Sequence, residues 1–295
     1  MMAELSNDPL WPRAGDWPAG RVGEYTDLAI LGIPTFRTSL SPSGAGATPT
    51  AVRAALRYYS EWAGGSRWPS IADWGDVPDP DGDGEAVAAA AARLAAQHSS
   101  LLIVLGGDNA ATVPAALGAW HDRLDTAGLV TLDAHHDLRD GVSNGSPVRR
   151  LLEAGLHGTR VVQIGIADFA NSAQYSQRAA ELGITVITRG ELAHRPIADA
   201  VAEAIEIAGG AGGPVHVDLD VDVCDRAVAP GCPASVPGGI SAAELRTAAR
   251  AAGRHPLVES IDLTEVDATA DSADGRTVRL VALCVLEAAA GWAER

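Results

Sequence analysis

The sequence has few cysteines and no long apolar segment. Its three cysteines, Cys224, Cys232 and Cys284, are an odd number at wide spacing, which argues against a disulfide framework. No apolar run approaches the roughly 20 residues that a transmembrane helix needs. Residues 1–20 also lack a basic segment followed by an apolar core, as a signal peptide would have. We therefore expect a cytoplasmic protein with no membrane partner.

Basic residues are scarce as well. The 22 Lys and Arg residues stand against 38 Asp and Glu residues, which gives a formal net charge of −16. Nucleic acids and anionic membranes bind clustered positive charge, so neither is expected as the main partner. An acidic chain instead tolerates a cationic ligand or a metal ion. Hydrophobic residues make up 47% of the chain, enough to build a packed core.

Short apolar runs alternate with longer, alanine-rich runs along most of the chain. Strands are predicted over 27–34, 101–108, 128–133, 160–165, 184–188, 214–220 and 257–263. Helices are predicted between them, most clearly over 49–62, 85–98, 111–122 and 277–293. This alternation is typical of an α/β fold with a parallel sheet covered by helices on both faces. Ligands of such folds bind beyond the carboxyl ends of the strands.

The first acidic segment follows the predicted strand 128–133. In Asp133-Ala134-His135-His136-Asp137, an extended backbone would place Asp133, His135 and Asp137 on one side and His136 on the other. Two carboxylates and one imidazole suit an ion such as Mn²⁺, Zn²⁺ or Fe²⁺. The alternative is a solvated acidic loop.

The second acidic segment, Asp218-Leu219-Asp220-Val221-Asp222, ends another predicted strand. Its three carboxylates would share one face of the strand and its apolar residues the other. Carboxylates this close repel one another, and a bound cation would keep them ionised. The alternative is an edge strand with one polar face.

Two weaker signals lie at further strand ends. Asp108 and Asn109 follow a glycine turn and offer oxygen ligands, and Glu265 could hold a planar cationic amidine through paired hydrogen bonds. Each alone is also typical of an exposed loop. Together, carboxylates of this kind can hold two ions ~3.5–4 Å apart that share and activate one water. The sequence has no Gly-x-Ser-x-Gly motif and no P-loop.

The residues resemble the ureohydrolase family, which comprises arginase, agmatinase, guanidinobutyrase and formimidoylglutamase. Gly106-Gly107-Asp108-Asn109 is similar to the family's GGDH, and Asp133–Asp137 to its DAHxD. Asp220-Val221-Asp222 with Asp225 and Ala229-Pro230-Gly231 resembles its DxDxxDP…APG. The likeness runs from about residue 28 to the C-terminus.

The resemblance implies a three-layer α/β/α sandwich of the arginase type with a central parallel sheet. It is expected to form a single domain over residues 1–295, with residues 1–26 as an N-terminal extension. It also implies two Mn²⁺ ions and a homo-oligomer, a trimer or hexamer. The implied metal ligands are Asp133 and Asp220 as bridges, His135 and Asp222 at one ion, and Asp137 and Asn109 at the other. Asp218 would then not be a ligand.

Two positions depart from the family pattern. Asn109 stands where the family has a metal-binding histidine, so the ion at that site is expected to bind weakly or to be missing. Asn144, in Ser143-Asn144-Gly145-Ser146-Pro147, stands where agmatinases have a histidine that shuttles protons. Formimidoylglutamases resemble this sequence in lacking that histidine.

The resemblance therefore implies a manganese-dependent hydrolase that cleaves a C–N bond of a linear amidine. The favoured substrate is N-formimidoyl-L-glutamate, which would give L-glutamate and formamide in histidine degradation. The residues expected to take part in catalysis are Asp137, Glu265 and Asn144, and those expected to bind substrate are Glu265, Asn144, Arg149 and Asp168. Two alternatives stay open: a guanidino hydrolase of the agmatinase or guanidinobutyrase type that releases urea, and a degenerate, non-catalytic homologue.

Overall fold

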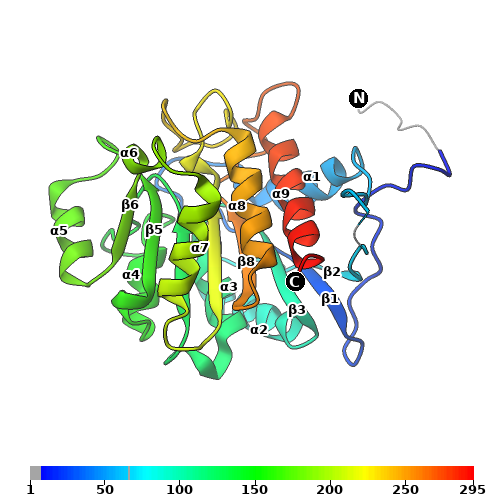
Figure 1. The fold of residues 1–295 in the computed structure, drawn as a ribbon, viewed down its shortest axis with the longest axis horizontal. Helices are drawn as coiled ribbons and strands as arrows, with labels where there is room; N and C mark the ends of the chain where they lie inside the picture. Colours follow the sequence, from blue (N-terminus) through cyan, green and yellow to red (C-terminus); the bar gives the residue numbers. More distant parts are fainter. Residues whose placement is uncertain (1–7, 66) are drawn as a thin grey trace.

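The computed structural model describes residues 8–65 and 67–295, and one eight-stranded sheet forms its centre (Figure 1). The strands follow the order β2-β1-β3-β8-β7-β4-β5-β6, and every neighbouring pair is parallel. The strands are β1 (Thr26–Ile33), β2 (Ile71–Asp76), β3 (Ser99–Gly106), β4 (Gly128–Leu132), β5 (Val161–Ile166), β6 (Thr185–Thr188), β7 (Val215–Asp220) and β8 (Val258–Thr264).

Helices cover both faces of the sheet. They are α1 (Thr48–Leu56), α2 (Glu85–Ala96), α3 (Thr112–Trp120), α4 (Pro147–Ala154), α5 (Ala173–Glu181), α6 (Arg189–Leu192), α7 (Ile197–Ala208), α8 (Ala242–Arg254) and α9 (Arg276–Trp292). Helices α7, α8 and α9 pack side by side in front of the sheet in Figure 1, with α1 against α9, while α2, α3 and α4 lie behind it. The predicted three-layer α/β/α sandwich with a parallel sheet is confirmed.

The strands are apolar on both sides because both sides are covered. In β3, Leu101 and Ile103 face the layer of α1 and α9, whereas Leu102 and Val104 face α2. β7 departs from this pattern. Its Val217 and Leu219 join the apolar core, but the alternate positions carry buried polar residues, namely His216, Asp218 and Asp220. Polar groups inside a sheet are costly unless they have partners, so β7 indicates a functional site.

One strand, β2, was not predicted from the sequence. Asp73, Gly75 and Asp76 interrupt its short apolar pattern, and the strand forms at the edge of the sheet beside β1. Arg53 of α1 compensates these charges, since its guanidinium pairs with Asp73 at 2.6 Å and with Asp76 at 2.5 Å. Tertiary contacts thus stabilise a segment that local pattern does not specify.

Two expectations about the whole chain have different outcomes. Within the described residues, no helix has the length and apolar character to cross a membrane. The organisation as a single domain with residues 1–26 as an extension stays a prediction, and residues 1–7 of that extension lie outside the described residues.

The turn after β3 depends on a glycine at position 107. A Cβ atom there would lie 2.0 Å from the carbonyl oxygen of Thr35. This close approach lets the Thr35 carbonyl accept a hydrogen bond from the Asp108 N–H at 2.9 Å, while the Gly107 N–H donates to Ile33 at 3.1 Å. The glycine therefore joins the ends of β1 and β3 and fixes the start of the following segment.

We expect the substitution Gly107→Ala to lower the free energy of unfolding by about 3 kcal/mol, because the backbone of Thr35 cannot yield as a flexible side chain would. Urea denaturation measures the change. The matched control is Gly190→Ala in the exposed helix α6, where the nearest atom to an added Cβ is 3.8 Å away, and it should change stability by less than about 0.5 kcal/mol. Equal stability of the two variants would contradict the argument.

Candidate functional site

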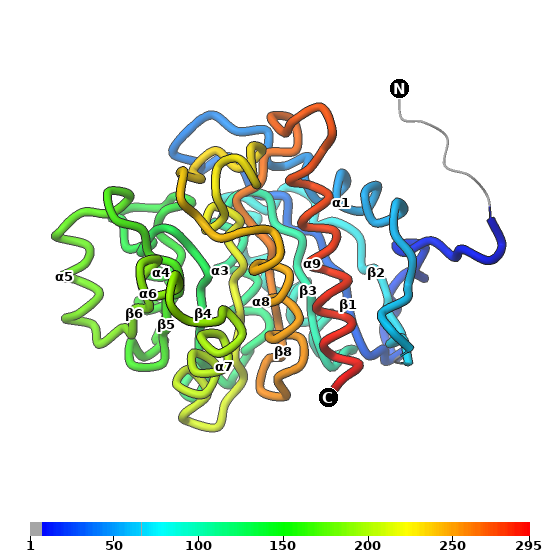
Figure 2. The backbone as a smooth tube through the Cα atoms, turned by 45° about the horizontal axis from the view of Figure 1, so that its top comes forward, coloured from blue at the N-terminus to red at the C-terminus, as the bar shows by residue number. Residues whose placement is uncertain are grey.

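The predicted site residues follow four strands that are neighbours in the sheet, in the order β3, β8, β7 and β4. Asn109 comes after β3, Glu265 directly after β8, Asp220 ends β7, and Asp133 directly follows β4. Because the strands are parallel, their carboxyl ends share one edge of the sheet. Figure 2 shows the loops that follow β7 (yellow) and β8 (orange to red) along that edge.

Five of the predicted ligands form two overlapping groups. Ligand atoms of Asp133, His135 and Asp222 lie within 4.8 Å of one another, and so do those of Asp133, Asp137 and Asp220. Asp133 belongs to both groups, and the four carboxylates are buried. The structure therefore brings these residues together in a form that two neighbouring cations could occupy, although their roles as ligands stay a prediction.

The backbone that achieves this convergence differs from the extended one assumed for both acidic segments. β4 ends at Leu132, and Asp137 has a left-handed backbone with φ of 52°. β7 ends at Asp220, and Asp222 lies in a short 3₁₀ turn whose first N–H groups are capped by Asp220, which accepts from the Asp222 N–H at 2.8 Å. The strand-alternation argument was wrong beyond Leu132 and Asp220, because tight turns aim the later carboxylates.

At the centre of the cluster, the buried carboxyl groups outnumber the basic groups that could neutralise them. Burial, and next the charge of Asp222, raises the pKa of Asp133 to about 7, and burial likewise raises the pKa of Asp137 and of Asp220. Burial opposes ionisation of His135 too, but the charges of Asp222 and Asp133 raise its pKa to about 12. Asp222 accordingly keeps a pKa below its ordinary value despite its burial, because His135 Nδ1 lies 2.6 Å from its Oδ2.

This cluster fits divalent cations by its chemistry. Asp133 Oδ2 is buried and has no hydrogen-bond partner among the described residues, which is a costly state for a carboxylate oxygen. One imidazole cannot balance four buried carboxylates. Carboxylate oxygens together with an imidazole nitrogen form a donor set that suits ions of the Mn²⁺ class.

Asn109 meets the cluster through its amide nitrogen. Its Nδ2 donates to Asp137 Oδ2 at 2.6 Å, while its Oδ1 accepts from the hydroxyls of Thr112 at 2.7 Å and Thr264 at 3.0 Å. The amide oxygen could bind an ion only if the amide turned over, with the two hydroxyls then accepting from its nitrogen. Its role as a metal ligand stays a prediction.

Glu265 and Asn144 form a second polar unit beside the cluster. Glu265 is buried, has a left-handed backbone with φ of 61°, and accepts from the Asn109 N–H at 3.0 Å. Asn144 Nδ2 donates to both carboxylate oxygens of Glu265, at 3.0 and 3.1 Å, and Asn144 Oδ1 accepts from the Leu40 N–H at 3.0 Å. Burial raises the pKa of Glu265 to about 8 although the hydrogen bond from Asn144 opposes this. Asn144 thus fixes the orientation of a strained, buried carboxylate.

A cavity of about 490 Å³ lies over both units. Asn171 and Tyr175 line it. Asp168 does not line it. This residue is exposed and borders a neighbouring hollow instead, because the chain turns outward after β5. The expectation that Asp168 contacts substrate is not supported by its position.

Arg149 is also turned away from the cavity. Its guanidinium is occupied by the carbonyl groups of Arg139 and Gly141 and by the carboxylate of Glu153, one turn along α4. The basic residue that does line the cavity is Arg139, which the sequence-based prediction missed. Its position two residues after the last acid of the Asp133–Asp137 segment was the available signal.

The fold and the cluster define an α/β protein with a candidate two-cation centre at the carboxyl edge of its sheet. The family model described as the arginase family matches residues 26–291. The chain belongs to this family and is an arginase-family hydrolase, as the resemblance of its motifs predicted.

Relatives with known activities cover most of the chain. Formimidoylglutamase of Halalkalibacterium halodurans is 34% identical over 272 residues, 86% of this chain and 83% of that protein. Guanidinobutyrase of Pseudomonas aeruginosa is 31% identical over 284 residues, 88% of this chain and 86% of that protein. The crystal structure of Bacillus subtilis formimidoylglutamase superposes with a TM-score of 0.90 at 28% identity, covering 99% of this chain and 95% of the other. The chain is thus similar to formimidoylglutamases throughout its length.

Proposed function

We propose that this protein hydrolyses N-formimidoyl-L-glutamate to L-glutamate and formamide, using two Mn²⁺ ions. The observation that carries the proposal is the placement of Glu265, a buried carboxylate held by Asn144 and by the Asn109 N–H at the edge of the carboxylate–imidazole cluster. A carboxylate in that position suits a planar amidinium group. Formimidoylglutamases among the relatives, at 34% and 31% identity, support the choice of substrate.

The proposed ions would be held by two groups of this chain's residues. Asp133, His135 and Asp222 would hold one ion, and Asp133, Asp137 and Asp220 the other, with Asp220 also reaching the first and Asn109 completing the second. When bound, such a pair neutralises the buried carboxylates and lowers the pKa of a shared water. A structure of Trypanosoma cruzi formiminoglutamase with Mn²⁺ has the same fold, with a TM-score of 0.86 at 24% identity.

The chain's own side chains would act on the substrate at defined atoms. Glu265 would accept hydrogen bonds from the amidinium nitrogens and Asn144 would keep both Glu265 oxygens in place. Asp137 would orient the attacking water. The oxygen of that water adds to the formimino carbon, and the bond from this carbon to the glutamate nitrogen breaks. With the amidinium form of the substrate, both protons of the water end on this nitrogen, which leaves as the ammonium group of glutamate, and the rest of the substrate leaves as formamide.

Asparagine at position 144 is compatible with this substrate. An amide does not titrate, so Asn144 cannot pass a proton to a leaving group. A formimino carbon bears a hydrogen in place of the third nitrogen of a guanidinium, is therefore more electrophilic, and needs less assistance from a general acid.

The proposal also includes a cytoplasmic location and a homo-oligomeric assembly, a trimer or hexamer. Light scattering on the purified chain measures the oligomeric state.

The test is a product analysis on the purified chain supplied with Mn²⁺, Ni²⁺ or Zn²⁺. N-Formimidoyl-L-glutamate, 4-guanidinobutyrate, agmatine and arginine are compared, together with the metal content. Formamide release with Mn²⁺ bound supports the proposal. Urea release from a guanidino compound, without formamide release, would replace it with a guanidino hydrolase, a reading that the guanidinobutyrase relative favours. No turnover and no bound ion would leave a non-catalytic homologue.

We expect Asn144→Asp to lower kcat/KM about 30- to 150-fold, because it replaces two hydrogen bonds to Glu265 with a like charge, and hydrogen bonds to charged groups contribute about 1.5–3 kcal/mol. Formamide release measures the effect, and Mn²⁺ content should not change. The conservative variant Asn144→His keeps an N–H donor and should lose less than about 10-fold. Equal losses in both variants would contradict the positioning role of Asn144.

A further inference from the structure

Arg139 is the one Lys or Arg side chain that lines the cavity over the cluster, among the residues the structure describes. Its side chain is exposed, and its guanidinium has no hydrogen-bond or ion-pair partner within the described chain. Neighbouring arginines are in contrast occupied, since Arg149 binds Glu153 and Arg150 binds Glu85. An unpaired guanidinium at the mouth of an acidic cavity is available for a ligand.

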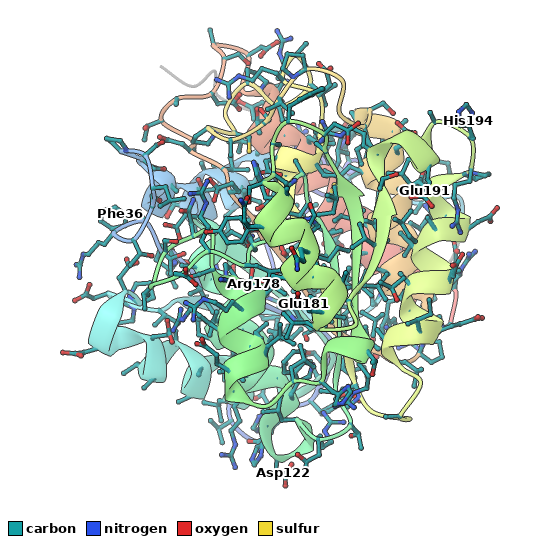
Figure 3. The ribbon with its side chains drawn as sticks, turned by 90° about the vertical axis from the view of Figure 1, so that its left-hand side faces the viewer. Phe36, Asp122, Arg178, Glu181, Glu191 and His194 are labelled. Atoms are coloured by element: carbon teal, nitrogen blue, oxygen red, sulfur yellow. The ribbon has the colours of Figure 1, made fainter. Side chains whose placement is uncertain are left out.

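Hydrogen bonds hold the backbone of Arg139 and its two neighbours in place. Its N–H donates to the Gly145 carbonyl at 3.0 Å, and its own carbonyl accepts from Arg149 Nε at 2.6 Å. Arg178, on the helix α5 that faces the viewer in Figure 3, donates to the Leu138 carbonyl at 2.7 Å and to Asp140 at 2.9 Å. The residues on both sides of Arg139 are therefore anchored, which presets where its side chain begins.

Gly145 leaves room for the stem of this arginine. A Cβ atom at Gly145 would lie 2.7 Å from Cδ and 3.2 Å from Nε of Arg139. The stem thus runs alongside the residue that follows Asn144. Arg139 and the Asn144–Glu265 unit consequently border the same cavity, with the cation at its exposed side and Glu265 buried at its floor.

Among the described residues, the cavity is lined by several acidic groups and by a single arginine. Its other ionisable lining groups are His135, His136, Asp137, Tyr175, Asp220, Asp222 and Glu265. A chain of net charge −16 repels anions in general, so a local cation favours the binding of an anionic group here. Arg139 supplies that cation, and it would repel a substrate whose tail ends in an ammonium group.

We propose that Arg139 determines substrate specificity by pairing with the carboxylate of the substrate's tail, so that the cavity accepts amidines with an anionic tail and disfavours those with a cationic one. The inference rests on the proposed function, because Glu265 must hold the amidine end. Guanidinium and carboxylate groups match as paired donors and acceptors. An exposed pair of this kind contributes less than a buried one.

The kinetic test compares Arg139→Gln with Arg37→Gln. Arg37 is an exposed arginine paired with Asp79 and does not line the cavity, so this control removes the same charge elsewhere. For N-formimidoyl-L-glutamate, Arg139→Gln should raise KM about 3- to 5-fold and change kcat less than about 2-fold, because an exposed ion pair contributes modestly to binding and the tail is remote from the reacting carbon. For agmatine, kcat/KM should stay equal or rise. A KM for formimidoylglutamate unchanged from that of Arg37→Gln would overturn the inference.

A binding measurement separates this inference from the proposed function. Calorimetric titration of the protein with L-glutamate alone needs no turnover. Arg139→Gln should weaken glutamate binding about 3- to 5-fold, while Arg37→Gln should bind as the unaltered chain does. If no amidine is turned over but this difference is found, the proposed function fails and the anion site stands. Equal titration curves for all three proteins, including three curves without binding, would overturn the anion site.

Discussion

Replacing Asp133 with asparagine should abolish turnover and remove most of the bound metal. Asp133 belongs to both groups of candidate ligands, so its loss should weaken the binding of both ions at once. Loss of a residue that merely orients a ligand costs about 10–100-fold in affinity or activity, and we expect the loss of a shared ligand to exceed this, with kcat/KM falling at least ~10³-fold. Elemental analysis after dialysis and formamide release measure the two effects.

The same substitution should have the opposite effect on the metal-free protein. Asp133 is buried beside Asp222, and one of its oxygens has no partner among the described residues. An amide removes the charge and its repulsion, so the metal-free variant should melt at least about 2 °C above the metal-free unaltered chain. Added Mn²⁺ should stabilise the unaltered chain but not the variant.

Asp83→Asn is the control for both measurements. Asp83 is an exposed carboxylate on the turn before α2, and its substitution should leave metal content, turnover and melting temperature nearly unchanged. An Asp133→Asn variant that retained two equivalents of Mn²⁺ would contradict the shared-ligand assignment. A metal-free variant less stable than the unaltered chain would contradict the argument from buried charge.

The sheet could be predicted because its strands are buried on both faces. The continuous apolar run of β3 has no other stable location than the interior of an α/β sandwich, and its helical neighbours carry their own period. The edge strand β2 could not be predicted, since it depends on Arg53, a residue of α1, to balance Asp73 and Asp76. Such compensation between distant segments leaves no mark in the local pattern.

The site was predicted to the extent that strand ends determine it. Residues directly after β4 and β8 must lie at the carboxyl edge, whatever the following loop does. The turns were not predictable, since the left-handed backbone of Asp137 and the 3₁₀ turn at Asp222 are set by contacts between the two loops. One such contact is the hydrogen bond from the Ala134 N–H to Asp222 Oδ1 at 2.9 Å.

Long side chains on loops were the hardest to assign. Arg139 and Arg149 are both close in sequence to the acidic segment, and either could reach a substrate. Three local acceptors occupy the Arg149 guanidinium, which leaves only Arg139 facing the cavity. Which of the two arginines faces the cavity depends on which backbone carbonyl groups lie within hydrogen-bonding reach of each guanidinium. The sequence pattern does not show this.

The substitution Glu265→Gln should lower kcat/KM about 10²- to 10³-fold while leaving metal content unchanged. Glutamine has the size of glutamate but cannot offer two anionic oxygens to an amidinium group, and truncating one partner of a buried charge pair costs about 2–5 kcal/mol. Glu265 belongs to neither ligand group, which separates this effect from that of Asp133→Asn.

Glu259→Gln is the matched control, because Glu259 lies at the opposite end of the same strand and pairs with Arg123 at 2.5 Å on an exposed surface. That variant should retain kcat/KM within about 2-fold, since exposed ion pairs contribute about 1 kcal/mol or less to stability and lie far from the chemistry. If Glu265→Gln also stayed within that range, the amidine end of the substrate would have to lie elsewhere in the cavity. A loss of Mn²⁺ in Glu265→Gln would instead make this carboxylate a part of the metal centre and leave the amidinium without its proposed partner.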